Sequence, residues 1–420
     1  MHFHHTRLTI GLLAALFAVV GLAPQAGAQS IKVLYALGAT STDAASPLGA
    51  LIADKTSLYG TANIGGEFGY GAVFQLTKPA SPGAPWTETI LYSFTGGADG
   101  SRPFDTLAMD STGVLYGTTA LGGASGDGVV FKLAPPAISG GLWSYSLIHT
   151  FAGTDGATPY AGVVIDRNGV LYGTTIAGGK YGVGAVYEVV PPTAGGAWTE
   201  NVLWSFSNAQ GAPAARGCEP YAGVTLSPQG TLYGTTQACG ANNGGVVYRL
   251  APPAPGQSNW SQAALHSFVA GGAEGYAPMG GVIFGRNRAL FGCTNAGNGS
   301  VFELSPPAIE GGAWTEQVIA SLPSYSYCQG NLAIDPASGA IYGTASLGGA
   351  NNAGNIFSLT PPSGGAWSFT DLYDFTGNAD GAFPYAGLLL RGGVLYGTTN
   401  AGGNSNFVTS GGGTIFGLVP

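Results

Sequence analysis

Charged side chains are scarce in this sequence. Only 8% of its 420 residues are Asp, Glu, Lys or Arg, and the 21 acidic residues outnumber the 13 basic ones. A protein that binds nucleic acid or anionic lipid through charge needs clustered Lys and Arg side chains. The sequence has no such cluster, so we expect neither nucleic acid nor a charged membrane surface as a partner.

Histidine is rare as well, which limits the chemistry open to the chain. Three of the five histidines lie within the first five residues, which leaves His149 and His266. No Ser-His-Asp arrangement can be assembled from so few, and no His or Cys cluster has metal-ligand spacing. We therefore predict no catalytic residue and no metal ligand. Both histidines are interpreted as scaffold residues, because other repeats carry aromatic residues at this position: Tyr35, Tyr92, Trp204 and Tyr373.

Long apolar runs are missing after the first 28 residues. Residues 8–22 are apolar and follow Arg7, and Ala26-Gly27-Ala28 supplies small residues suited to cleavage. This pattern predicts a signal peptide over 1–28, removed before Gln29. The run is too short for a convincing membrane span. We expect an exported protein, secreted or periplasmic, with no membrane span.

One short phrase returns seven times and organises the rest of the chain. Its aromatic residues are 51 to 61 residues apart, a period typical of repeat architectures. The seven copies are Leu58-Tyr59-Gly60-Thr61, Leu115-Tyr116-Gly117-Thr118, Leu171-Tyr172-Gly173-Thr174, Leu232-Tyr233-Gly234-Thr235, Leu290-Phe291-Gly292-Cys293, Ile341-Tyr342-Gly343-Thr344 and Leu395-Tyr396-Gly397-Thr398.

Each repeat reads as four short strands separated by Gly, Pro, Asn and Asp turns. In the third repeat the expected strands are 161–166, 170–175, 184–190 and 195–206. Four antiparallel strands per unit are typical of a propeller blade. The first fourth-type strand, 31–37, precedes all other strands, and the chain ends with a third-type strand at 414–418. We predict a single all-β domain over 29–420, a seven-bladed β-propeller closed by its N-terminal strand.

A tryptophan opens six of the seven fourth-type strands. Aromatic side chains bury large areas, and one per repeat suits packing between blades better than a sugar-stacking platform. The six are Trp86, Trp143, Trp198, Trp260, Trp314 and Trp367.

The pattern D-G-x-x-P, G-x-L-Y-G-T-T, G-G and G-x-V-F-x-L, repeated in this order, resembles the GloVer tandem repeat of exported bacterial proteins. The resemblance covers essentially all of residues 29–420. It implies an exported repeat protein whose biochemical role is unknown, so it adds little about function.

A carboxylate recurs four residues before the proline in the loops that connect blades. The structural interpretation is that it caps a turn; the functional one is that it binds Ca²⁺ or sugar hydroxyls. Adjacent blades are too far apart to share one metal, and we expect no other cofactor. The carboxylates are Asp43, Asp99, Asp155, Glu274 and Asp380, with Arg216 and Ser324 in the other two blades.

The four cysteines suggest disulfides in an oxidising compartment. Cys218 and Cys239 fall in loops of the fourth repeat that emerge on one face, and Cys293 and Cys328 belong to the fifth and sixth repeats. We expect the pairs Cys218–Cys239 and Cys293–Cys328. Four cysteines allow three connectivities, and the sequence leaves the other two open.

Two functions follow from these observations. The first is a non-catalytic, monomeric binding or scaffold propeller that recognises an extracellular glycan or protein on its loop-rich face. The second is a propeller glycoside hydrolase or polysaccharide lyase, which the nearly uncharged channel strands disfavour. Any ligand is expected near blades four to six, where the repeat is least regular and Arg216 lies close to Glu219.

Overall fold

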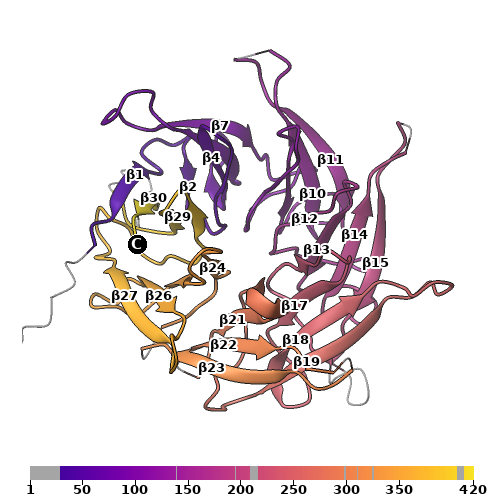
Figure 1. Ribbon diagram of the computed structural model, residues 1–420. Coiled ribbons are helices and arrows are strands. Elements are labelled where there is room, and N and C mark those ends of the chain that lie inside the picture. Colours follow the sequence, from indigo (N-terminus) through magenta and orange to yellow (C-terminus); the bar gives the residue numbers. More distant parts are fainter. Residues whose placement is uncertain are drawn as a thin grey trace, which may run out of the picture.

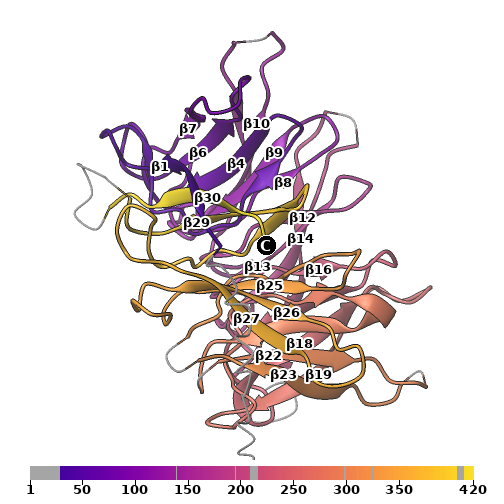
Figure 2. The same cartoon turned by 60° about the vertical axis from the view of Figure 1, so that its left-hand side comes forward.

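The computed structural model describes residues 29–138, 140–193, 195–208, 216–297, 299–309, 311–323, 326–403 and 411–420. The expected signal peptide and Ser324 lie outside these ranges. Figures 1 and 2 show sheets arranged in a ring, with short strands nearest the centre and long ones at the rim.

Seven four-stranded antiparallel sheets form the blades of a β-propeller, as the repeat predicts. Blade one contains β3 (Ile52–Ala53), β4 (Ser57–Ala62), β6 (Ala72–Thr77) and β7 (Thr87–Ser93). Blade two contains β8 (Ala108–Met109), β9 (Leu115–Thr119), β10 (Val129–Ala134) and β11 (Ser144–Thr150). Blade three contains β12 (Val164–Ile165), β13 (Leu171–Thr175), β14 (Ala185–Val190) and β15 (Thr199–Ser205).

The remaining blades repeat this order. Blade four contains β16 (Thr225–Leu226), β17 (Leu232–Thr236), β18 (Asn243–Ala251) and β19 (Ser261–Val269). Blade five contains β20 (Ile283–Phe284), β21 (Leu290–Thr294), β22 (Ser300–Ser305) and β23 (Thr315–Ser321). Blade six contains β24 (Ala333–Ile334), β25 (Ile341–Ala345), β26 (Asn355–Thr360) and β27 (Ser368–Asp374). A ribbon of β2 (Ala44–Ala45) and β5 (Ile64–Gly65) and a 3-10 helix, η2 (Arg286–Arg288), lie outside the blades.

Blade seven combines the two ends of the described chain. It contains β28 (Leu389–Arg391), β29 (Val394–Thr399), β30 (Thr414–Leu418) and β1 (Lys32–Ala36). The first strand pairs antiparallel with the last, Lys32 opposite Gly417 and Ala36 opposite Thr414. The predicted closure by the N-terminal strand is therefore confirmed. Pairing these two edges removes the exposed strand that would invite aggregation.

The glycine of the repeated phrase is fixed by close packing within the blade. A Cβ built on Gly343 would lie 2.3 Å from the ring of Phe357 on the next strand. The same ring position is filled by a fully buried aromatic residue in every blade. A larger residue than glycine would displace this ring from the core.

The hydrophobic core lies largely between neighbouring blades. Tyr59 and Val73 of blade one, for example, belong to the same buried cluster as Leu115 and Phe131 of blade two. Five of the six blade-opening tryptophans lie against the repeated aromatic residue of the preceding blade, at ring-centroid distances of 5.7 to 6.5 Å, as their expected packing role requires. The pairs are Tyr59–Trp143, Tyr116–Trp198, Tyr172–Trp260, Tyr233–Trp314 and Phe291–Trp367.

Threonine hydroxyls also join the blades. Thr118 Oγ1 donates to the carbonyl of Ala161 in the next blade at 2.8 Å, and Thr398 Oγ1 reaches Gly49 across the ring closure at 3.4 Å. No helix in the described ranges is long and apolar enough to cross a membrane.

Candidate functional site

All seven blades contribute to a cavity of about 410 Å³, which therefore lies on the ring axis. In each blade one contributor is the residue that follows the connecting-loop proline, or Cys328 in blade six. We call these seven the axial residues: Leu48, Phe104, Tyr160, Tyr221, Met279, Gln329 and Tyr385.

An unusual backbone turn positions the axial residues. The residue before the proline has a positive φ of 54° to 57° in six blades, although none of the six is glycine. Left-handed conformations of this kind are costly for non-glycine residues and are often found at functional sites. The six residues are Ser46, Arg102, Thr158, Glu219, Ala277 and Phe383.

Three consecutive axial residues form an aromatic arc, defined as Phe104, Tyr160 and Tyr221. The ring centroids of Phe104 and Tyr160 are 4.5 Å apart, and those of Tyr160 and Tyr221 are 5.1 Å apart. All three side chains are half-buried. The arc thus offers aromatic surface to the cavity from blades two to four.

One carboxylate lines the cavity, that of Asp105. Its Oδ2 accepts a 3.0 Å hydrogen bond from the Gly162 N–H of blade three, and its Oδ1 accepts one from Thr106 Oγ1, also at 3.0 Å. Burial raises the pKa of Asp105, and the hydrogen bonds from Gly162 and Thr106 oppose that rise. Gly or Ala stands at this position in the other six blades, so Asp105 breaks the symmetry of the channel.

Amide side chains complete the polar lining of the cavity. Asn63, Gln329, Asn331 and Asn400 all border it. The amide of Asn331 is held in place, because its Oδ1 accepts a 2.7 Å hydrogen bond from the Gly281 N–H. The cavity therefore combines aromatic faces with uncharged donors and acceptors, and one carboxylate.

The predicted carboxylates lie at the blade junctions and do not line the axial cavity. Each of the five accepts a hydrogen bond from a backbone N–H of its own loop, as the turn-capping interpretation expects. The donors are Thr40 to Asp43, Thr95 to Asp99, Ala152 to Asp155, Val269 to Glu274 and Thr376 to Asp380.

Several of these carboxylates also contact the preceding fourth strand. Tyr92 Oη donates to Asp99 at 3.0 Å, and Tyr373 Oη donates to Asp380 at 2.9 Å. Burial alone would raise the pKa of Asp380, but the hydrogen bonds from Thr376 and Tyr373 outweigh it and lower the pKa below its ordinary value.

The junction of blades three and four replaces both partners of this contact together. Trp204 stands in place of the tyrosine, and the guanidinium of Arg216 lies 5.0 Å from the centroid of its ring. A cation–π contact thus replaces the hydroxyl–carboxylate bond. Glu219 is exposed, and its N–H donates to the Val183 carbonyl at 2.9 Å.

Both expected disulfides are present. Cys218–Cys239 joins two loops of blade four, and Cys293–Cys328 joins blade five to blade six. The second bond lies beside the axial cavity, because Cys328 directly precedes Gln329.

The structure brings both histidines against pairs of carboxylates, a grouping that sequence spacing did not reveal. His149 lies with Asp155 and Glu200, and His266 with Glu274 and Glu316. Burial, with a smaller contribution from Asp155, raises the pKa of Glu200 to about 7. Burial and the charge of Glu274 likewise raise the pKa of Glu316 to about 7. The glutamates come from the neighbouring blade, which is why no local motif could identify the groups.

The axial residues were not predicted from the sequence, although the sequence contains a signal for them. The position after the connecting-loop proline is aromatic in four of the seven repeats: Phe104, Tyr160, Tyr221 and Tyr385. Large aromatic residues directly after a proline turn are poor candidates for a buried strand. Their recurrence outside the expected strands could have identified them as cavity residues.

The sequence profile described as the Gloeobacter/Verrucomicrobia repeat matches residues 18–141 and 138–313. No curated protein matches the chain. Among solved structures, the extracellular domain of a one-component system from B. thetaiotaomicron is 11% identical, with a TM-score of 0.50 over 93% of this chain and 42% of that chain.

Two further solved structures resemble this one. A protein assigned as a 6-phosphogluconolactonase from Bacteroides uniformis is 12% identical, with a TM-score of 0.48 over 79% of this chain and 85% of that one. A PL25 ulvan lyase is 11% identical, with a TM-score of 0.48 over 92% and 95% of the two chains. At these identities the similarity concerns the fold alone.

Proposed function

The chain belongs to the Gloeobacter/Verrucomicrobia repeat family, and we propose that it is an exported, non-catalytic β-propeller that binds an uncharged glycan in its axial cavity. The two disulfides support export, because such bonds persist in oxidising compartments. The residues that line the axial cavity support an uncharged glycan as the ligand.

The observation that carries the proposal is the aromatic arc beside the axial cavity. Sugar rings present apolar C–H faces, which stack on aromatic side chains, and hydroxyls, which need hydrogen-bond partners. Phe104, Tyr160 and Tyr221 supply the faces, and Asn331 and Asp105 supply polar groups that are already held in position. Pre-organised side chains lower the entropy cost of binding.

The charge of the cavity favours an uncharged glycan. Asp105 is the one carboxylate among the described residues that line the cavity, and no Lys or Arg is among them. A polyanionic chain would therefore meet a carboxylate and no compensating cation. An uncharged chain would meet only hydrogen-bonding groups and aromatic faces.

The residues that line the axial cavity also make catalysis the weaker proposal. Glycoside hydrolases usually need two carboxyl groups about 5 to 10 Å apart, and the described lining offers one. A lyase could use a tyrosine as base, but burial and the nearby Tyr160 and Glu219 raise the pKa of Tyr221. A higher pKa makes the tyrosinate form rarer near neutral pH.

The test is a glycan array followed by calorimetric titration of residues 29–420 with the glycans that bind. Replacing Phe104 or Tyr160 by Ala should weaken binding of an uncharged glycan at least about tenfold, which is about 1.4 kcal/mol. The matched control is Phe68→Ala, because Phe68 is 49% exposed and does not line the axial cavity.

Equal affinity of the Phe104→Ala and wild-type proteins would refute the axial site. Binding of acidic glycans only would refute the ligand class. Shortening of a polysaccharide during incubation, abolished by Tyr221→Phe or by Asp105→Asn, would favour the enzyme instead.

A further inference from the structure

At several blade junctions in the described part of the chain, three sequence positions lie together, and we call such a group a junction triad. The first is the aromatic or histidine residue near the end of a fourth strand, and the second is the connecting-loop residue. The third lies two residues after the blade-opening tryptophan of the next blade. Two triads contain histidine: His149, Asp155 and Glu200, and His266, Glu274 and Glu316.

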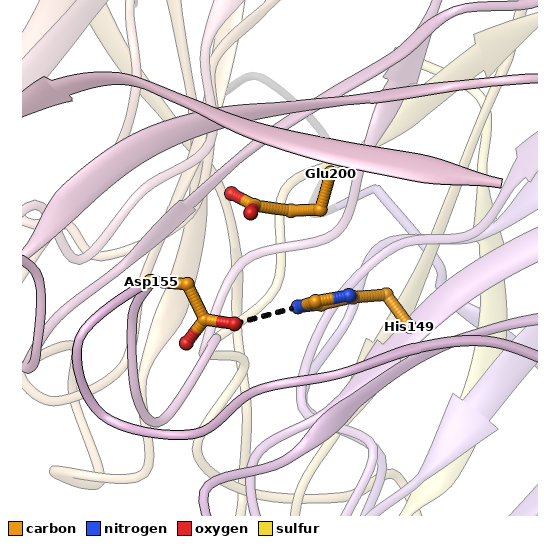
Figure 3. Close-up of side chains that lie close together, drawn as sticks. All are labelled: His149, Asp155 and Glu200. Carbon is orange, nitrogen blue, oxygen red and sulfur yellow. Dashed lines mark hydrogen bonds and ion pairs between the residues drawn. The ribbon is translucent and has the colours of Figure 1, made fainter.

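The ligand atoms of each histidine triad converge on one small space. In each group, one side-chain N or O atom per residue lies within 4.8 Å of the other two. His149 Nε2 lies 3.0 Å from Asp155 Oδ2, and His266 Nε2 lies 3.4 Å from Glu274 Oε2. Figure 3 shows the Asp155–His149 contact and Glu200 reaching toward it from the neighbouring strand.

The glutamate of each histidine triad leaves one buried carboxylate oxygen without a hydrogen-bond partner. Among the described residues, Glu200 Oε1 and Glu316 Oε1 are buried and accept no hydrogen bond. A buried carboxylate oxygen without a partner is costly.

In triads without histidine the third residue contacts other groups. Glu88, in the triad of Tyr35 and Asp43, interacts with the Tyr35 hydroxyl and the Ala44 N–H, although its Oε1 is also buried without a partner. In the triad of Tyr92 and Asp99 the third residue is Tyr145, whose hydroxyl donates to the Asp99 carbonyl at 2.8 Å. In both triads whose first position is histidine, the second position is an acidic residue and the third is a glutamate.

We propose that each histidine triad binds one divalent transition-metal ion, with Zn²⁺ as the best-fitting class, between blades two and three and between blades four and five. One imidazole nitrogen and two carboxylate oxygens are ligands that Zn²⁺ accepts, and three protein ligands leave a fourth position for water. Ca²⁺ prefers six to eight oxygen ligands, so an imidazole with two carboxylates suits it less well.

Such an ion would join neighbouring blades. His149 belongs to β11 of blade two and Glu200 to β15 of blade three, so both blades must be in place for the ion to bind. Ions that bind only the folded state raise its stability by mass action. The role is thus structural and independent of the glycan proposed above.

The experiment is calorimetric titration of EDTA-treated residues 29–420 with ZnCl₂, MnCl₂ and CaCl₂ in separate runs. We expect two Zn²⁺ ions per chain, weaker Mn²⁺ binding and no saturable Ca²⁺ binding. His149→Tyr should remove one Zn²⁺ site, and combining it with His266→Tyr should remove both. Tyrosine occupies this position in three other blades, at Tyr35, Tyr92 and Tyr373, so these variants should keep the fold.

Two further variants sharpen the test. Tyr35→His should create a third site, because Asp43 and Glu88 already occupy the other two positions of its triad. Tyr92→Phe, where the third residue is Tyr145, should leave two sites.

The melting temperature gives a second readout. Zn²⁺ should raise the melting temperature of the wild type and leave that of the double variant unchanged. Absence of saturable Zn²⁺ binding to the wild type, or two ions still bound by a folded double variant, would overturn the proposal.

Discussion

Cys293 is bonded to Cys328 at the point where the other six blades are joined to their neighbours by a threonine hydroxyl. The repeated phrase ends in threonine in those blades, and its Oγ1 donates to a carbonyl of the next blade. The six donors are Thr61, Thr118, Thr174, Thr235, Thr344 and Thr398. In blade five the disulfide replaces this hydrogen bond. The disulfide and the threonine hydrogen bond are therefore alternative links between neighbouring blades.

The first prediction concerns that exchange. Replacing Cys293 and Cys328 by Ala should lower the free energy of unfolding by about 2 to 4 kcal/mol, because the disulfide and any substitute link are both lost. Cys293→Thr with Cys328→Pro introduces the residues that the other blades carry, so it should lose less. Urea unfolding of both variants measures the difference. Equal losses would mean that the threonine link contributes nothing here.

The second prediction concerns ring closure. Deleting residues 29–38 removes β1 and leaves β30 with an unpaired edge. The truncated protein should aggregate or melt well below the full chain, because exposed edges pair with other molecules. Calorimetry and size-exclusion chromatography measure both effects. Lys32→Ala is the control, since Lys32 is exposed and its loss should leave the melting temperature unchanged. A monomeric truncated protein with full stability would contradict the closure.

The third prediction concerns pH and Glu88. Burial, with the nearby charge of Asp43, raises the pKa of Glu88 to about 7. The folded state therefore binds this proton more tightly than the unfolded state. The resulting stability is fully present below a pH of about 4.5 and is lost as the pH rises through about 7.

Glu88→Gln should remove that dependence. The wild type should lose about 2 kcal/mol more than the variant between pH 5 and pH 8, measured by urea unfolding in EDTA. Glu67→Gln is the control, because Glu67 is an exposed glutamate of the same blade. Parallel pH profiles of the Glu88→Gln and wild-type proteins would show that Glu88 ionises as it does in the unfolded chain.

The fold was predictable because the same order of apolar strands and turn residues recurs in each repeat. The third repeat was expected to form strands over 170–175 and 184–190, and β13 and β14 occupy Leu171–Thr175 and Ala185–Val190. The inner strand was expected over 161–166 but covers only Val164–Ile165. The reason is that Ala161 and Gly162 form contacts with blade two, to Thr118 and Asp105, instead of extending the ladder.

The candidate site was harder to predict, because its residues meet only when the ring closes. Asp105 belongs to blade two and Gly162 to blade three, and nothing in either repeat predicts their hydrogen bond. Glu200 likewise reaches His149 from another blade. The carboxylates that the sequence did mark, such as Asp99 and Asp380, accept hydrogen bonds from backbone N–H groups of their own turns. Regular recurrence thus revealed scaffold residues, whereas the cavity residues vary from blade to blade.

The last prediction separates two locations for the glycan. Asp105→Ala introduces the residue that blades three, four and seven carry at this position, as Ala161, Ala222 and Ala386. It removes the one cavity carboxylate, and a lost hydrogen bond to a charged group costs about 1.5 to 3 kcal/mol. Affinity for an uncharged glycan should therefore fall at least about tenfold. The melting temperature should fall as well, because the Gly162 N–H loses its hydrogen bond to Asp105.

Arg216→Ala and Glu219→Ala serve as the comparison, because they lie in the sector that sequence irregularity favoured. Arg216 is engaged by Trp204, and Glu219 is exposed away from the axial lining. Both variants should bind the glycan as the wild type does. Loss of binding in these two, with unchanged affinity in Asp105→Ala, would place the ligand on the outer loops of blade four. Loops held on a rigid scaffold can carry such a site, so titration of all three variants decides between the axis and the rim.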